Sequence, residues 1–277
     1  MQNSLASKFG KHLTQLRQES PLTDEQLFRV APSIFAEDKH GSRSDRYTYI
    51  PTIDIVNGLR REGFMPFMVA QSRTRDEGKQ EHTKHMLRLR RADQINGAVA
   101  NEIVLINSHD GTSSYQMLAG IFRFVCCNGM VAGDTVEDIR VPHRGNITHD
   151  VIEAAYTIVE DFDKVHESID TMKSIQLLPE ESEIFARAAL ALKYDDEHTP
   201  VSERQVLLPK RFEDKKNDLW TTFNRAQENL IKGGQKGFAT TGKRTTTRPV
   251  QSIDNNVKLN KGLWILADQM AKLKLGN

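Results

Sequence analysis

A chain of 277 residues with 38% hydrophobic and 27% charged residues can form one large domain or two ordinary ones, and its composition is typical of a soluble globular protein. The formal net charge of +1 disfavours an acidic mimic of DNA, and no apolar run approaches the roughly 18 residues that indicate a membrane-spanning helix. The start lacks the features of a secretory signal, and the only cysteines, Cys126 and Cys127, are adjacent, a spacing that rarely forms a disulfide. We therefore expect a protein of the reducing cytoplasm without a membrane partner.

Short helices are predicted over the first part of the chain. Residues 1–20 carry apolar side chains at helical spacing, and a proline ends the pattern. Thr23 opens a capping signal for a second short helix. After a polar loop at residues 36–46, Thr52 is the expected N-cap of a third helix that closes at Gly63.

The middle of the chain is predicted to form strands. Residues 64–75 and 85–91 are separated by a turn signal, and residues 102–108 form a short apolar run between further turn signals. Residues 115–125 fit both a helical period and strict alternation, and we favour a helix there. Alternation over residues 136–141 predicts one more strand.

From residue 146 onward the chain is predicted to be helical. Helices are expected over residues 148–165, 179–192, 219–231 and 257–275, with a long basic loop at residues 233–256 before the last one. The fold class is therefore α+β, with a small, mainly antiparallel sheet in the N-terminal half and a helical C-terminal half. We expect a sheet-bearing domain at residues 1–145 and a helical region at residues 146–277, which can also pack together as one domain.

Residues 71–91 carry a local excess of positive charge on a nearly neutral chain, which is typical of a surface that binds a polyanion. Two arginines alternate with two leucines near the end of this segment, so in a strand both guanidinium groups leave one face while the leucines pack on the other. The alternative is a solvated hairpin that is basic for solubility. The candidate phosphate-binding residues of this segment are Arg73, Arg75, Lys84, Arg88, Arg90 and Arg91.

A second basic segment at residues 232–248 contains no acidic residue. Its glycines allow the backbone to approach a phosphate, and its threonines add hydroxyl donors. Phe238 could stack on a base, as aromatic residues do in proteins that bind single strands. The alternative is a disordered loop that serves only solubility. The candidate residues of this segment are Lys236, Lys243, Arg244 and Arg248.

The polar loop at residues 107–114 follows a predicted buried strand, a place where functional groups often gather. His109 and Ser113 could add hydrogen bonds to a nucleic-acid backbone. A hydrolase triad is disfavoured, because an adjacent His and Asp point in divergent directions and no nucleophile elbow is present. A plain turn is the alternative to a binding loop.

No metal, cofactor or catalytic residue is predicted. A structural zinc site needs spaced cysteines, and Cys126 and Cys127 have no spacer. Asp54, Glu77 and Lys79 superficially match the arrangement of a magnesium-dependent nuclease, but the last two fall in a predicted turn, where the carboxylates would not converge. No phosphate-binding loop of a nucleotide-hydrolysing enzyme is present.

Five sequence blocks are distinctive: FAEDKH at residues 35–40, EHTKHMLRLRR at 81–91, NSHDGTSSYQ at 107–116, CNG at 127–129 and NDLWTT at 217–222. In this order they resemble domain-of-unknown-function family 932, whose members are carried by prophages and plasmids. The resemblance extends over nearly the whole chain and brings no established activity with it. It implies a mobile genetic element in a bacterial cytoplasm.

Two classes of function fit that context. The order of a helix, three strands and a long helix, at residues 52–63, 64–109 and 148–168, is similar to the core of single-strand-annealing recombination proteins, which bind the nucleic-acid backbone along a basic groove and often form rings. We therefore expect a homo-oligomeric protein that binds single-stranded DNA, or other nucleic acid, in recombination, annealing or replication. A protein-binding antidefence or regulatory factor is the alternative, although it has no need of two basic segments. A magnesium-dependent nuclease is the second alternative.

Overall fold

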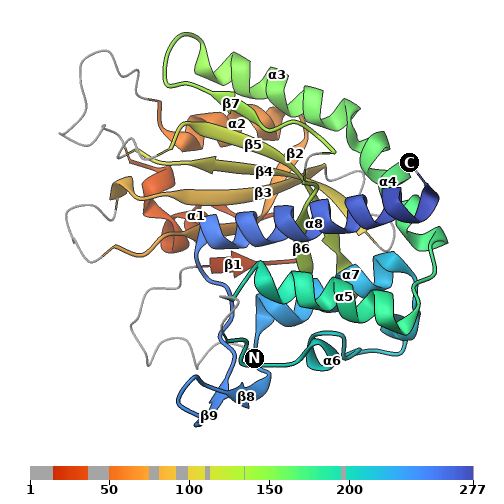
Figure 1. Ribbon diagram of the computed structural model, residues 1–277. Helices are drawn as coiled ribbons and strands as arrows, with labels where there is room; N and C mark the ends of the chain where they lie inside the picture. Colours follow the sequence, from red (N-terminus) through yellow and green to blue (C-terminus); the bar gives the residue numbers. More distant parts are fainter. Residues whose placement is uncertain are drawn as a thin grey trace. The chain divides into compact units, whose positions relative to one another are not determined.

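The computed structural model of the chain (Figure 1) describes residues 15–36, 50–74, 81–91, 99–109, 113–133, 135–194 and 198–276. The chain divides into two compact units that are interleaved along the sequence. The first unit contains residues 1–95, 102–117 and 139–156, and the second contains residues 96–101, 118–138 and 157–277. The expected division after residue 145 stays a prediction, because compactness does not show which segments fold independently.

The strands form an antiparallel sheet in the order β1-β2-β3-β4-β5-β6, with β7 paired to β5. Together with the helices of the second half of the chain, this sheet confirms the predicted α+β class. The strand bounds are Gln15–Arg17 for β1, Phe64–Gln71 for β2, His85–Arg91 for β3, Val99–Asn107 for β4, Tyr115–Arg123 for β5, Asn128–Val131 for β6 and Ile139–Val141 for β7.

Strand β3 has the predicted bounds, and β2 and β4 confirm two further predicted strands. The helix expected over residues 115–125 is wrong, because this segment forms β5, which pairs with β6 and β7. Residues 117–122 of β5 are all buried. A strand that is buried on both faces has a continuous apolar sequence, which periodicity alone does not separate from a buried helix. The helix expected over residues 1–20 is wrong at its described end, since Gln15–Arg17 pairs with β2.

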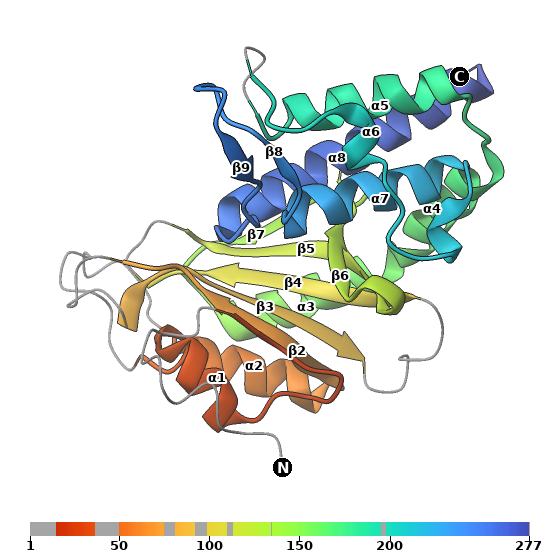
Figure 2. The ribbon, with the colours of Figure 1, turned by 90° about the horizontal axis from the view of Figure 1, so that it is seen from below.

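Three helices belong wholly or mostly to the first unit: α1 (Asp24–Val30), α2 (Thr52–Arg61) and α3 (Ile147–Glu160). Figure 2 shows α1 and α2 on the same side of strands β2 and β3. Thr23 caps α1 through a capping box, as predicted. The predicted cap of α2 is wrong, because Pro51 is the N-cap and Thr52 is already the first helical residue. The hydroxyl of Thr52 is therefore available for tertiary hydrogen bonds.

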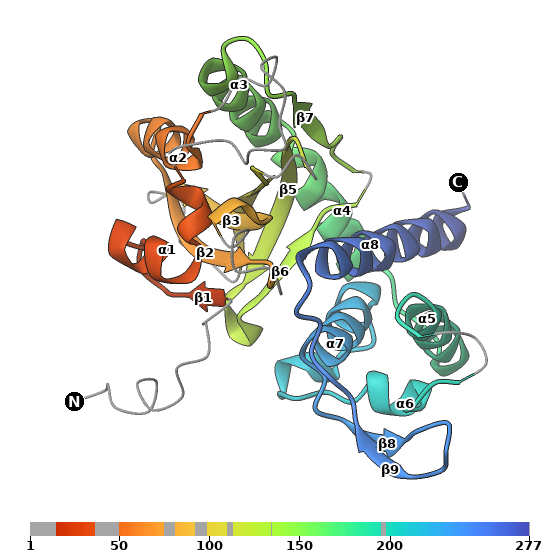
Figure 3. The ribbon, with the colours of Figure 1, turned by 90° about the vertical axis from the view of Figure 1, so that its left-hand side faces the viewer.

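The second unit contains helices α4 (Phe162–Ser174), α5 (Pro179–Ala191), α6 (Glu203–Val206), α7 (Leu219–Lys232) and α8 (Ile253–Leu275). Figure 3 shows α5, α7 and α8 side by side. Helix α7 contacts the four other helices and is buried along most of its length. Its Trp220 and Phe223 rings stack with centroids 5.4 Å apart, and both meet the Trp264 ring of α8 edge-on. This aromatic cluster lies in the core of the unit.

Two details of the helical prediction are wrong. The single helix expected over residues 148–165 is divided into α3 and α4, with a break at Asp161. The long loop expected over residues 233–256 contains a hairpin of β8 (Lys236–Phe238) and β9 (Arg244–Thr246), and α8 already begins within it. None of the described helices combines the length and the apolar character needed to cross a bilayer. Short 3-10 segments complete the described elements at Pro32–Ile34, Phe124–Cys126 and Glu213–Lys215.

Candidate nucleic-acid interface

The two central arginines of the first basic segment are buried. Arg88 and Arg90 share one face of β3, as their alternation predicts, but each is only 1% exposed. Their guanidinium groups bind the carboxylate of Glu102 on β4, with N–O distances of 2.8 Å for each ion pair. The guanidinium group of Arg90 also lies over the Phe67 ring, 4.7 Å from its centroid. This burial disfavours the predicted phosphate contacts of both arginines, which stay a prediction.

Glu102 explains why this face can be buried. Its side chain is fully buried, and burial alone would raise its pKa. The positive charges of Arg88, Arg17 and Arg90 outweigh that effect and hold the pKa of Glu102 below its usual value. The carboxylate is therefore charged at neutral pH, and it neutralises guanidinium groups that would otherwise be costly to remove from water. This cluster is a structural ion-pair cluster, and its burial makes both arginines inaccessible to a ligand.

The other members of the first basic segment keep only part of the predicted surface. Arg73 is exposed, whereas Lys84 and Arg91 are half-buried. The guanidinium group of Arg91 lies 5.9 Å from the centroid of the Phe64 ring. Arg75 lies outside the described residues. A basic surface around β3 is therefore much smaller than the sequence suggests.

His109 is also fully buried, which disfavours the predicted contact between this residue and a phosphate, and that contact stays a prediction. Its Nε2 lies 3.0 Å from the hydroxyl oxygen of Thr52, which also lies 3.0 Å from Nε2 of His85 and 3.1 Å from Nδ2 of Asn107. Burial and the nearby His85, His143 and His82 lower the pKa of His109 to about 2. The imidazole is therefore neutral across the physiological pH range.

The hydrogen bonds around Thr52 have a defined direction. The hydroxyl of Ser33 donates to the amide oxygen of Gln71 at 2.8 Å, so it accepts the hydrogen bond from Nδ1 of His85, also at 2.8 Å. If His85 carries a single ring proton, its Nε2 then has none and accepts from the Thr52 hydroxyl. Since Thr52 has one proton to donate, Nε2 of His109 must be the donor in the remaining bond. The Thr52 hydroxyl thereby uses its one donor and both of its acceptor sites, which is typical of a buried structural network.

The outer part of this network reaches the half-buried His143, whose Nε2 donates to Oδ1 of Asn107 at 3.0 Å. Ser113 makes local hydrogen bonds. Its amide donates to Oγ of Ser108, and its hydroxyl donates to the Ser114 carbonyl. These contacts favour the plain turn over a binding loop. Ser113 is only partly exposed, and its contact with a phosphate stays a prediction.

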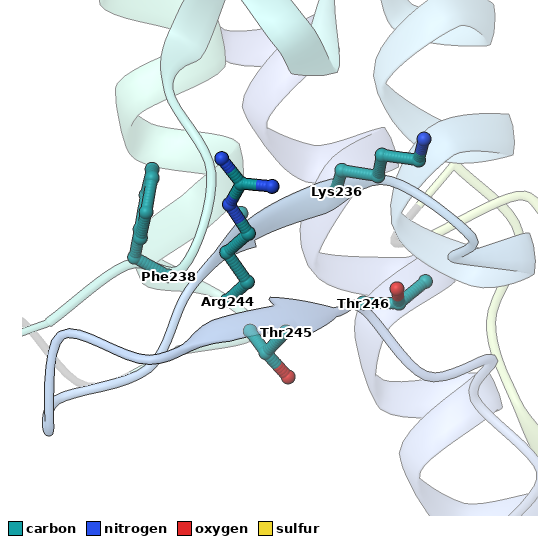
Figure 4. A pocket seen from close by; sticks show the side chains of 6 residues that line it. Lys236, Phe238, Arg244, Thr245 and Thr246 are labelled. Carbon is teal, nitrogen blue, oxygen red and sulfur yellow. The ribbon is translucent and has the colours of Figure 1, made fainter.

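The β8–β9 hairpin of the second unit presents the second basic segment on an exposed face. Phe238 pairs with Arg244, and Lys236 pairs with Thr246, so these four side chains lie on the same face of the hairpin. Figure 4 shows Lys236, Phe238 and Arg244 around a shallow pocket, while Thr245 points to the opposite side. The pocket measures about 540 Å³. Lys236 and Arg244 are exposed, and Phe238 is 58% exposed.

The opposite face of the hairpin is held firmly against the preceding segment of the chain. The amide of Phe238 donates to the carbonyl of Pro200 at 3.0 Å, and Nε2 of His198 donates to the carbonyl of Phe238 at 2.8 Å. Nε2 of Gln205 donates to the carbonyl of Lys236 at 2.7 Å. A Cβ atom on Gly237 would lie 1.8 Å from the carbonyl oxygen of Pro200, so only glycine fits this approach. These bonds hold the backbone while the side chains of the exposed face remain accessible.

The described carboxylates do not neutralise the positive charge of this face. Lys236, Lys243, Arg244 and Arg248 are all exposed, and no carboxylate of the described residues lies within ion-pair distance of them. Lys232, at the end of α7, differs from them because its ammonium group binds Glu228 at 3.0 Å. The hairpin is therefore a basic surface that remains open among the described residues.

Neither a metal site nor a nuclease site emerges from the described residues. No group of three or more His, Cys, Asp and Glu side chains gathers there as potential metal ligands. Asp54 is exposed on α2, and Glu77 and Lys79 lie outside the described residues. Cys126 is buried and its thiol contacts the carbonyl of Arg123, as expected for a small core residue.

Residues 39–264 match the family described as Domain of unknown function (DUF932). UPF0380 protein YafZ and UPF0380 protein YfjQ of Escherichia coli (strain K12) are each 54% identical to this chain over 266 residues. These alignments cover 96% of this chain and 97% of each relative. No solved structure matches the chain. The resemblance seen in the five sequence blocks is thereby confirmed, and the chain belongs to the DUF932 family.

Proposed function

We propose that this protein binds single-stranded nucleic acid through the exposed face of the β8–β9 hairpin, in recombination, strand annealing or replication of a mobile genetic element. The observation that carries the proposal is the combination of Lys236, Arg244 and Phe238 on one exposed face whose backbone is fixed from behind. Cations without a carboxylate partner attract the phosphate backbone, and an exposed aromatic ring offers a surface on which any base can stack.

The chemistry of this face favours binding with little sequence preference. Lysine and arginine bind phosphate groups, which are the same in every nucleotide, and stacking on Phe238 uses the ring face that all bases share. If Lys236, Lys243, Arg244 and Arg248 each contact one phosphate, the log–log slope of affinity against salt for a single strand is roughly −3. Double-stranded DNA offers no unstacked base to Phe238 and should bind more weakly.

The test is a fluorescence-anisotropy titration of a labelled single-stranded oligothymidine at two salt concentrations, with and without magnesium. We expect Lys236→Gln with Arg244→Gln to weaken binding at least roughly tenfold, which is about 1.4 kcal/mol, and to make the salt slope shallower by about 1.4. The matched control is Lys215→Gln with Lys216→Gln, which removes the same charge from exposed positions of the same unit. Equal affinity of the hairpin and control variants would contradict the proposal.

The protein-binding alternative has one observation in its favour. Leu178 and Ile184, at the start of α5 and within it, are each 60% exposed, so both side chains are accessible to another protein or to a second copy of this chain. Homo-oligomerisation, which the single-strand-annealing analogy suggests, belongs to the same question. Light scattering of the wild-type protein and of Ile184→Ser separates self-association from binding of another protein. A lower mass of the Ile184→Ser variant indicates that the wild-type protein self-associates through this surface. Magnesium-dependent loss of the labelled strand in the titration would instead support the nuclease alternative.

A further inference from the structure

A second basic hollow lies in the same unit, where the end of α5, the segment after β9 and the first turns of α8 meet. It measures about 540 Å³, within the range of roughly 300–1,000 Å³ that is typical of small-molecule sites. We call it the Lys193 pocket. Its polar lining residues are Lys193, Tyr194, Arg248, Gln251, Asn255 and Lys258, and the remainder are apolar.

Lys193 is the most constrained cation of this pocket. Its ammonium group donates to the carbonyls of Leu230 at 2.6 Å and Arg248 at 3.2 Å, and it lies 5.2 Å from the centroid of the Tyr194 ring. It is half-buried, and no carboxylate among the described residues compensates its charge. Burial without a counter-charge lowers the pKa of Lys193. Two of the three ammonium protons are used by these carbonyls, so one donor remains for a ligand.

Lys258 and Arg248 add two exposed cations that also lack an ion-pair partner among the described residues. The contrast with the rest of α8 is informative, because three other lysines of that helix are paired: Lys261 with Asp138, Lys272 with Asp268 and Lys274 with Glu181. None of the residues that line the pocket is acidic. The acidic residues at positions 195–197 follow Tyr194 in the sequence and lie outside the described residues.

We infer that the Lys193 pocket binds the phosphate group of a nucleotide, with Lys193, Arg248 and Lys258 as its cationic contacts. Three positive charges around one concave site suit a doubly charged phosphate better than a single carboxylate. The Tyr194 ring and the apolar lining offer a surface for a base or sugar. The nucleotide is either free or part of a strand held by the hairpin, which is joined to the pocket through Arg248. The strand-bound form rests on the proposed function, and the free form does not.

The experiment is an isothermal titration with thymidine 5′-monophosphate, with thymidine and inorganic phosphate as partial probes, and a parallel anisotropy titration with oligothymidine. The test variant is Arg248→Gln with Lys258→Gln, which leaves Lys193 and its backbone contacts in place, and the control is again Lys215→Gln with Lys216→Gln. We expect the test variant to lose at least tenfold in affinity for the monophosphate. Thermal melting of each variant verifies that it is folded, and Lys258→Gln alone is the reserve variant.

The two titrations separate the sources of the phosphate. Because Arg248 is also a proposed strand contact of the hairpin segment, Lys258→Gln alone makes this comparison. Loss of monophosphate affinity with unchanged oligothymidine binding in that variant assigns the pocket to a free nucleotide, whereas weakened oligothymidine binding assigns it to the strand. The inference is overturned when the test variant matches the control for both probes, or when thymidine binds as tightly as its monophosphate. Failure of the proposed function is distinguishable: monophosphate would bind at the pocket while wild-type protein ignores oligothymidine. The hairpin variant should keep its affinity for the monophosphate.

Discussion

Two pairs of cations lie on β-strands in this protein, and they have opposite environments. Arg88 and Arg90 on β3 are buried and bind Glu102, whereas Lys236 and Arg244 on the β8–β9 hairpin are exposed and have no carboxylate partner among the described residues. In both cases alternation places the two cations on one face. What decides their role is the strand beside them: β4 carries a carboxylate, while the two strands of the hairpin carry none. Positive charge in a sequence is therefore evidence for a binding surface only after its neighbouring strand has been considered.

The largest expected effect tests the buried pair. Glu102→Gln should lower the free energy of unfolding by about 3–5 kcal/mol, because it leaves two buried guanidinium groups without their counter-charge. Urea denaturation measures this effect. Lys236→Gln with Arg244→Gln should change stability by no more than about 0.5 kcal/mol, as for other exposed substitutions. Similar free energies of unfolding for the two variants would contradict the contrast between a buried, paired cluster on β3 and exposed, unpaired cations on the hairpin.

A second test concerns the support behind the hairpin. Gly237→Ala places a methyl group on the carbonyl of Pro200, so we expect a loss of roughly 1–3 kcal/mol in stability together with weaker oligothymidine binding. Thr246→Ala, at an exposed position of the same hairpin, is the control and should bind nearly as wild type. Thermal melting and anisotropy measure the two effects. Full binding by Gly237→Ala would show that a fixed backbone is not required.

The third test uses pH, which should affect the buried network of the first unit. The pKa of His109 is lowered to about 2 in the folded state, and burial also lowers that of His143. The unfolded chain takes up protons below pH 6.5 that the folded chain does not, so stability is fully present above this pH and falls as the pH decreases. One such group contributes about 1.4 kcal/mol per pH unit, or roughly 2 kcal/mol between pH 6.5 and 5.

Urea denaturation at several pH values measures this slope. His109→Gln should make it shallower, whereas His149→Gln, at an exposed position, should leave it unchanged. An identical slope in all three proteins would mean that His109 is not the buried neutral group of the network.

The smallest expected effect sharpens the description of the hairpin. Phe238→Ala should weaken oligothymidine binding by about 1 kcal/mol, the lower end of the range for one stacked base, with no change in the salt slope. Phe212→Ala is the matched control, because Phe212 is a 78% exposed phenylalanine of the same unit. A salt slope that changes with Phe238→Ala would indicate that the ring positions the cations and does not stack.

Sequence reasoning succeeded where local pattern and tertiary environment agree. The bounds of β3, the cap of α1 and helices α5 and α7 follow from alternation, capping residues and terminal glycine or proline. It failed at β5, whose two buried faces remove the alternation, and at Thr52, whose hydroxyl bonds to residues of β3 and β4 in place of its own helix. Such bonds depend on which distant segments meet, and a one-dimensional pattern does not contain that information.

The candidate site shows the same division. Composition alone predicts the four cations of the hairpin segment, but the sequence predicts a loop in place of the hairpin, because its strands have only three residues each. The sequence also contains a signal for the burial of Arg88 and Arg90. Glu102 is a single acidic residue at the start of an apolar run, and a strand with two arginines precedes it. An acidic residue in such a run needs a buried partner of opposite charge, and the alternating arginines of the preceding strand can provide it.

The cluster around Glu102 has a consequence for how the chain finds its fold. Side chains on adjacent strands share a face only in the correct register, and a slip of one residue between β3 and β4 would turn Glu102 away from both arginines. Three charges would then be buried without compensation, whereas the apolar residues of these strands would tolerate the slip more easily. We expect the cluster to specify the register of β3 and β4 during folding. Sheets with a shifted register would be destabilised by their unpaired buried charges, even where their hydrophobic contacts are nearly as favourable.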